Sequence, residues 1–282
     1  MEDRDRLRDI LLGLPDRGCE YTFGNIYIWK DVYETEIMWN GGTAAVRFGS
    51  VTPGCLYPMG PDVEGTVKKV LSDGTDTFVA LREEDCSELE RLFPGKFTFS
   101  DMGLGEYVYN SSDLIELKGK KFHGQRNHIS KFVSEHPGYS FREIDRDSID
   151  SVRKMDLKWV RQNDQSRSNV GIEQEASAVN LAFDNFFELG FKGGYIETET
   201  GIVAFSMGEP INSETFCTHI EKAYHSVNGA YNVINRDFAK HFCSGYKYIN
   251  REDDAGAENL REAKMMLHPA FVTKKFRAVY GG

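Results

Sequence analysis

The sequence predicts an α+β fold with two similar halves, each a mixed sheet flanked by helices. Short strand patterns alternate with amphipathic helical patterns, the same order of elements occurs twice, and a basic helical segment lies between the two occurrences. We expect a first half over residues 1–112, a joining basic helix over 113–137 and a second half over 138–282. The amino-acid sequences of the two halves show no repeat, so only the order of helices and strands is duplicated.

The first half opens with a meander of short strands and then alternates helices with strands. Gly41-Gly42 and Thr52-Pro53-Gly54 provide turns between the first strands. The expected strands are Glu36–Asn40, Thr43–Phe48, Cys55–Met59, Thr77–Leu81 and Tyr107–Tyr109, and the expected helices are Val63–Leu71 and Cys86–Phe93.

The second half repeats this order with longer helices. Tyr231, Ile234, Phe238 and Phe242 keep helical spacing and predict one apolar helix face. The expected strands are Tyr139–Ile144, Tyr195–Thr198, Ile202–Met207, Thr215–Ile220, a strand from Tyr246 and a last strand Phe271–Tyr280; the expected helices are Ser148–Arg161, one around Val179, Tyr231–Phe242 and one around Leu260.

The segment between the halves is the one dense positive region of an acidic chain. Ile115, Phe122, Ile129 and Val133 fall on one side of a helix, which Pro137-Gly138 ends. Lysines at positions 118, 120, 121 and 131 surround that side. The segment is either an anchor for phosphate or a solvated helix whose lysines keep it soluble.

Composition limits the function classes. The 282 residues are 40% hydrophobic and 12% aromatic, as in a folded globular protein, and the formal net charge is -10. An acidic surface disfavours nonspecific binding to nucleic acid or anionic lipid. No apolar run approaches the ~18 residues that a membrane-spanning helix needs. The five cysteines are isolated and lack CxxC spacing, so we expect a reduced, cytoplasmic protein without a metal site.

Polar groups gather where strands of the second half give way to helices, which is where α/β sheets tend to bind ligands. After one strand, Asn228-Gly229 forms a turn that would leave the first N–H groups of a helix free for an anion. His219, Glu221 and His225 precede that turn and are either proton-transfer groups or half-exposed strand residues. After the next strand comes the acidic turn 250–254, which caps a following helix.

Three segments together resemble one family, the bacterial phosphatidylglycerol lysyltransferase C-terminal domain. They are GKKFHGQRNHISKF from Gly119, HIEKAYHSVNGAYNVINRDFAKHF from His219 and YINREDDAGAENLREAK from Tyr248, and the match extends from about FGNIYIW at Phe23 to the last strand. The resemblance implies two tandem acetyltransferase-like (GNAT) domains. Membrane-bound members move an amino acid from aminoacyl-tRNA to phosphatidylglycerol, and this chain is similar to shorter soluble relatives without an assigned substrate.

The resemblance implies which residues of this chain match the functional positions of the family. On the joining helix these are Lys120, Lys121, His123, Arg126, Asn127 and His128. In the second half they are Gly229, Tyr231, Asn232, Asn235, Asn250, Glu252, Asp253, Gly256, Leu260, Arg261 and Lys264. One departure concerns the donor: the stretch from His225 to Ala230 lacks the first residue and the first glycine of the usual Q/R-x-x-G-x-G/A loop. This argues against coenzyme A and favours aminoacyl-tRNA.

These positions suggest direct acyl or aminoacyl transfer to a lipid, peptide or small-molecule acceptor. Glu252 or Asp253 would orient or deprotonate the acceptor, and Asn232 would stabilise the carbonyl oxygen. The binding positions, for phosphate or for developing charge, would be Gly229, Ala230, Lys121, Arg126, His128, Arg261 and Lys264. Two alternatives stay open: a catalytically inactive module that binds an anionic ligand or peptide, and a nucleic-acid-binding protein acting through the joining helix.

Overall fold

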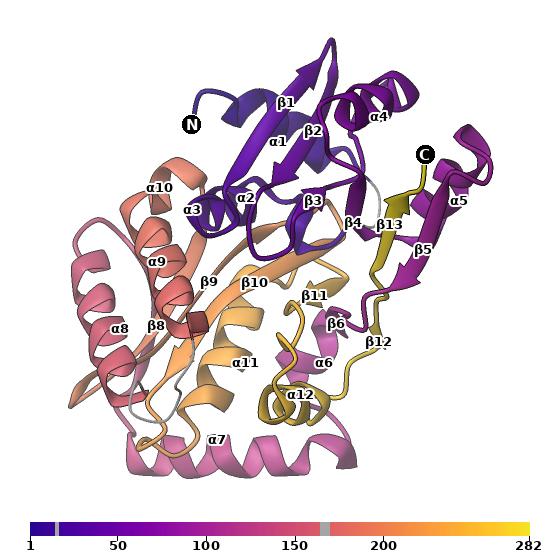
Figure 1. Cartoon of the computed structure of the whole chain (residues 1–282). Helices are drawn as coiled ribbons and strands as arrows, with labels where there is room; N and C mark the ends of the chain where they lie inside the picture. Colours follow the sequence, from indigo (N-terminus) through magenta and orange to yellow (C-terminus); the bar gives the residue numbers. More distant parts are fainter. Residues whose placement is uncertain (15–16, 164–169) are drawn as a thin grey trace.

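The protein contains two β-sheets that share a continuous interior (Figure 1). The computed structural model describes residues 1–14, 17–163 and 170–282. The first sheet has the strand order β1-β2-β3-β4-β13-β5. Its strands are β1 (Thr35–Asn40), β2 (Thr43–Phe48), β3 (Gly54–Cys55), β4 (Thr77–Leu81), β5 (Phe97–Asp101) and β13 (Phe276–Tyr280).

The second sheet has the order β12-β6-β11-β10-β9-β8-β7. Its strands are β6 (Tyr107–Asn110), β7 (Ser140–Glu143), β8 (Lys192–Thr198), β9 (Gly201–Pro210), β10 (Thr215–Ala223), β11 (Tyr248–Asn250) and β12 (Phe271–Val272). Both sheets are mixed, because β3 pairs with β4 and β10 with β11 in parallel while the other ladders are antiparallel. This confirms the predicted α+β class.

Each half of the chain contributes one strand to the sheet of the other half. β6 pairs with β11 and β12 in the second sheet, whereas β13 lies between β4 and β5 in the first. The expected ranges 1–112 and 138–282 therefore do not coincide with the two sheets. The single strand expected over Phe271–Tyr280 is wrong, because β12 and β13 belong to different sheets and three residues separate them.

The helices cover both faces of the second sheet, and further helices pack against the first (Figure 1). In β8 and β9, Tyr195 and Phe205 join the core cluster that contains α8 and α9 residues, whereas the adjacent Ile196 and Ala204 join the cluster of α11. The helices are α1 (Arg4–Leu12), α2 (Phe23–Ile28), α3 (Lys30–Tyr33), α4 (Val63–Ser72), α5 (Glu83–Leu92), α6 (Ser111–Glu116), α7 (His123–Glu135), α8 (Ile149–Asn163), α9 (Val170–Asp184), α10 (Phe186–Leu189), α11 (Ala230–Phe242) and α12 (Glu258–Met265). Within the described ranges, no helix has the length and apolar character required to cross a bilayer.

The joining segment is broken, not one helix over 113–137. α6 ends at Leu117, which has a left-handed backbone (φ 50°), and Gly119 (φ 88°) redirects the chain before the 3-10 turn η2 (Lys120–Phe122) and α7. The guanidinium of Arg126 donates to the carbonyl groups of Leu117 and Gly119, so it closes this bend. Glycine supplies the required positive φ without a steric cost.

The two halves are packed into one body. The largest core cluster contains Leu7 and Phe78 from the first half together with Phe183 and Phe205 from the second. α2 packs directly on α9, which brings residues 23–28 against the second half. The N-terminal helices α1–α3 and strand β5 were not predicted from the sequence.

Candidate functional site

Glu252 follows strand β11 and lies at the junction of the two halves, where hydrogen bonds hold its backbone in an uncommon conformation. The side-chain oxygen of Asn250 accepts a hydrogen bond from the Glu252 N–H at 2.8 Å, and its amide nitrogen donates to Glu106. The N–H of Tyr107 donates to the Glu252 carbonyl at 3.0 Å. These contacts hold Glu252 at φ 59°, a left-handed conformation that is uncommon for a residue with a side chain and that often marks functional sites.

His219 meets Glu252 from the neighbouring strand. The β9–β10 ladder slips between Thr218 and Ile220, so His219 is the extra residue of a β-bulge. Its Nδ1 lies 2.7 Å from Glu252 Oε1 and its Nε2 lies 3.2 Å from Glu209 Oε1. Burial opposes protonation of this imidazole, but Cys217 and the two carboxylates raise the pKa of His219 well above its ordinary value.

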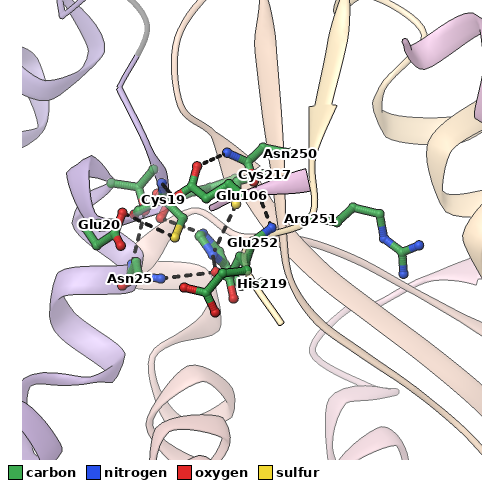
Figure 2. A network of polar contacts seen from close by, with 12 residues as sticks. Cys19, Glu20, Asn25, Glu106, Cys217, His219, Asn250, Arg251 and Glu252 are labelled. Carbon is green, nitrogen blue, oxygen red and sulfur yellow. Dashed lines mark hydrogen bonds and ion pairs between the residues drawn. The ribbon is translucent and has the colours of Figure 1, made fainter. Parts of the chain in front are cut away.

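The first half reaches the same carboxylate through α2. Thr22 caps this helix by accepting a hydrogen bond from the N–H of Asn25 at 3.3 Å. The amide of Asn25 then donates to Glu252 Oε1 at 3.2 Å (Figure 2). One carboxylate thus joins an N-terminal helix, a strand of the second sheet and the loop after β11.

A buried lysine forms the other half of the polar network. Lys275, between β12 and β13, lies 3.0 Å from Glu106 Oε1 and 3.6 Å from Asp253 Oδ2, and it also contacts Glu20. Burial raises the pKa of Glu20 to about 7, against the attraction of Lys275. Glu106 is buried too, but Lys275 and hydrogen bonds from Asn250 and Cys19 lower its pKa to about 2. One ammonium does not fully compensate both carboxyl groups, so the pKa of Glu20 rises while that of Glu106 falls.

Negative charge exceeds positive charge in this network, which we call the junction cluster. Among the described residues, two cationic side chains contact its carboxylates, Lys275 and His219. The carboxylates are Glu20, Glu106, Glu209, Glu252 and Asp253. Glu106 and Glu209 are buried, whereas the side chains of Glu20, Glu252 and Asp253 are 24%, 24% and 28% exposed. Three of the five carboxylates of the cluster are therefore partly accessible to solvent.

The structure brings the predicted catalytic residues Glu252 and Asp253 together in this cluster. Asn232 is half-buried in the first turns of α11 and has no contact with Glu252 among the interactions of the described residues. Its proposed role remains a prediction. Cys217, His219, Glu209, Glu106, Glu20 and Lys275 were not assigned to a site from the sequence, although His219 was considered for proton transfer.

The predicted cations of α12 brace the loop that carries Glu252. Lys264 donates to the carbonyl groups of Arg251, Glu252 and Asp253. Arg261 donates to Asp254 at 2.8 Å, and this hydrogen bond is the main reason that the pKa of Asp254 falls to about 2. Phosphate binding by Lys264 and Arg261 stays a prediction, and both already have structural partners.

The predicted anion loop at Gly229 is packed against α7. A Cβ on Gly229 would lie 2.5 Å from the carbonyl oxygen of His128, whose ring in turn lies 3.3 Å from Asn228. The N–H of Ala230 donates to Val227 at 3.2 Å, so this donor is not free for an oxyanion or a phosphate.

The two other α7 cations are also engaged. Lys121 pairs with Asp113 at 3.1 Å, and Arg126 closes the bend before α7 as described above. An ion pair also lies between the strands that lead into the Gly229 and Asn250 loops. Both loops leave the same end of the parallel strands β10 and β11, and this ion pair, at 2.5 Å between Arg251 and Glu221, joins the strands there.

Comparison with known proteins identifies the family and the fold. Residues 13–279 match the family described as phosphatidylglycerol lysyltransferase, C-terminal. A conserved protein of unknown function from Bacteroides thetaiotaomicron is 32% identical, with a TM-score of 0.92 over 99% of this chain and 97% of that one. An uncharacterized protein of Mycoplasmoides gallisepticum is 21% identical over 60% of this chain, a match that spans 54% of that relative.

More distant structures share the fold. The C-terminal domain of a putative lysylphosphatidylglycerol synthetase from Agrobacterium fabrum is 14% identical, with a TM-score of 0.69 over 100% of this chain and 92% of that one. L-PGS of Bacillus licheniformis is 17% identical, with a TM-score of 0.61 over 87% and 84% of the two chains. The predicted tandem GNAT-like fold, with its aminoacyl- or acyl-transferase-like architecture, is confirmed. The chain belongs to the phosphatidylglycerol lysyltransferase C-terminal family.

Proposed function

We propose that this protein is an aminoacyltransferase that moves an amino acid from aminoacyl-tRNA to a hydroxyl or amine acceptor at the junction cluster. The excess of carboxylate over cationic side chains carries the proposal. An aminoacyl ester brings an α-ammonium group, which this negative environment attracts.

The closed Gly229 loop supports the same donor. A GNAT enzyme that uses coenzyme A needs free backbone N–H groups at this position for the pyrophosphate. Here the Ala230 N–H is donated to Val227, and the carbonyl group of His128 lies over Gly229. The family supports transfer to phosphatidylglycerol as one choice, with a peptide or another small molecule as the alternatives for the acceptor.

Glu252 is positioned to accept the proton of the acceptor. Its Oε1 is held by His219 and Asn25, whereas Oε2 has no hydrogen bond among the described residues and the side chain is partly exposed. The acceptor oxygen or nitrogen attacks the ester carbonyl carbon, and the bond to the ribose oxygen of the donor breaks. The proton that the acceptor loses passes through Glu252 to that ribose oxygen.

The test is transfer of a radiolabelled amino acid from a mixed aminoacyl-tRNA pool into a bacterial lipid and peptide extract. Glu252→Gln should abolish transfer with nearly unchanged melting temperature, whereas Glu258→Gln, on an exposed residue of the nearby α12, should retain it. Acetyl-coenzyme A should give no product. Absence of transfer by the unmodified protein with every donor would refute the proposal and leave an inactive binding module.

A further inference from the structure

Three side chains of the junction cluster combine a thiol, an imidazole and a carboxylate in one place. Cys217 Sγ, His219 Nδ1 and Glu252 Oε1 all lie within 4.8 Å of one another. Cys217 and His219 are two positions apart on β10, and Glu252 follows the adjacent strand β11. From this geometry we propose that Cys217, His219 and Glu252 bind a zinc ion. The inference shares Glu252 with the proposed transfer reaction, but its test does not depend on turnover.

The distances fit a tetrahedral ion with a small adjustment. Zinc bonds of about 2.3 Å to sulfur and about 2.0–2.1 Å to nitrogen or oxygen place sulfur and nitrogen ~3.6 Å apart and nitrogen and oxygen ~3.3 Å apart. Cys217 Sγ and His219 Nδ1 are 3.5 Å apart, which already matches. His219 Nδ1 and Glu252 Oε1 are 2.7 Å apart, so the Glu252 oxygen must move by roughly 0.6 Å. A partly exposed side chain on a loop allows this movement.

The surroundings orient the imidazole as metal sites require. A metal-binding histidine usually gives its other N–H to a carboxylate, which fixes the tautomer. Here Glu209 accepts from Nε2 at 3.2 Å, which leaves Nδ1 for the ion. Glu209 is itself buried and pairs with Cys217 in the β9–β10 ladder, so the orienting carboxylate and the thiol are held by the same strands. Asn25 orients the Glu252 carboxylate in the same way.

Charge favours a divalent ion at this point. Zinc binds the thiolate and the neutral imidazole, so its binding releases the protons that these groups hold in the metal-free protein. The ion would then neutralise Cys217 and Glu252 next to a further buried carboxylate, Glu209. Three protein ligands leave a fourth position, which is the arrangement of zinc sites that bind water or a substrate oxygen.

The experiment measures metal binding without any donor or acceptor. Untagged protein is stripped with a chelator, loaded with zinc or cobalt(II), and examined by elemental analysis, competition with a chromophoric chelator and absorption spectroscopy. We expect one ion per chain and, with cobalt, a thiolate-to-metal charge-transfer band. Cys217→Ser should remove that band, whereas the matched Cys243→Ser, on a buried cysteine outside the cluster, should keep it.

A second substitution tests the orienting carboxylate and does not touch a ligand. Glu209→Gln should weaken zinc binding by about 10–100-fold while the cobalt band persists. Circular dichroism reports whether each variant folds. The inference is overturned if the loaded wild-type protein lacks a thiolate band, if it binds well below one equivalent, or if folded Cys217→Ser retains full affinity. Because these readouts need no turnover, an inactive protein that binds zinc would refute the transfer proposal alone.

Discussion

Lys275→Met tests whether the junction cluster holds the two halves together. Lys275 is 7% exposed and is the ammonium between Glu20, Glu106 and Asp253. Methionine keeps the length of the side chain and removes its charge. Glu106, which has no exposed side-chain surface, then remains as a buried carboxylate without a cation.

The expected loss follows from the burial of the pair. Removing one partner of a buried ion pair costs about 3–5 kcal/mol, because the other charge is left without compensation. The lowered pKa of Glu106, to which the charge of Lys275 contributes most, shows that Lys275 favours the charged form of Glu106 in the folded protein. We therefore expect Lys275→Met to reduce the free energy of unfolding by about 3–5 kcal/mol at pH 8.

The pH dependence makes this prediction specific. In the wild-type protein the depressed pKa of Glu106 stabilises the fold above pH ~4.5, and this contribution disappears as the pH falls through about 2. In the variant, burial without a cation raises the pKa of both Glu20 and Glu106, so the folded state is favoured at low pH and weakened as the pH rises. The deficit should therefore be smaller at pH 5 than at pH 8.

Urea denaturation at the two pH values gives the free energies, and the double variant Lys275→Met/Glu106→Gln provides the control. Because the double variant removes the buried charge as well, it should recover part of the loss at pH 8. A deficit under about 1 kcal/mol, or one that is equal at pH 5 and pH 8, would refute the reasoning, because it would mean that water or a rearranged side chain compensates Glu106.

Three further substitutions test other parts of the structure. Gly208→Ala places a Cβ 1.9 Å from the carbonyl oxygen of Cys217, opposite the His219 bulge, so it should lower the free energy of unfolding by about 3 kcal/mol. Gly245→Ala, which adds a Cβ in open space, should leave the stability unchanged, and equal melting temperatures of the two variants would contradict this reasoning. Arg261→Met should lower the free energy of unfolding slightly at pH 7, because it removes the main hydrogen bond that lowers the pKa of Asp254. The difference should fade as the pH falls towards about 2, where Asp254 takes up its proton in the folded wild-type protein; a constant difference in urea titrations would be inconsistent. Arg126→Met should lower the free energy of unfolding by about 1 kcal/mol, because the carbonyl groups of the bend before α7 lose their hydrogen-bond donor. Unchanged stability together with weakened tRNA binding would instead support the anion-binding role of Arg126.

Local patterns in the sequence were enough to predict much of the second sheet and its helices. The apolar spacing from Tyr231 to Phe242 predicted α11, and alternating residues flanked by turns predicted β8, β9 and β10. These elements are determined by contacts within one segment and by burial of one face. The bend at Leu117 and Gly119 was missed because apolar spacing continued across it, and only the backbone conformation reveals the break.

The candidate site was predicted only in part, because its residues come from distant segments. Glu252 and Asp253 were found through the family motif after β11, and Asn25 lies within another quoted motif. Glu20, Glu106 and Lys275 have no mutual spacing that a sequence pattern could show. Ligand binding by the cations of α7 and α12 stays a prediction; in this structure Lys264 and Arg126 donate to backbone carbonyl groups.

The exchange of strands explains why a charged cluster lies between the halves. Glu106 immediately precedes β6, which enters the second sheet, and Lys275 immediately precedes β13, which enters the first. The two crossing segments run side by side: the Thr273 N–H donates to the Glu106 carbonyl, and the Glu106 N–H donates to the Thr273 hydroxyl, each at 3.0 Å. The Glu106–Lys275 pair therefore lies where the chain crosses in both directions, and the network from it through Asn250 reaches Glu252. The carboxylate that we propose accepts the proton is therefore connected, through hydrogen bonds and one ion pair, to both segments that cross between the sheets.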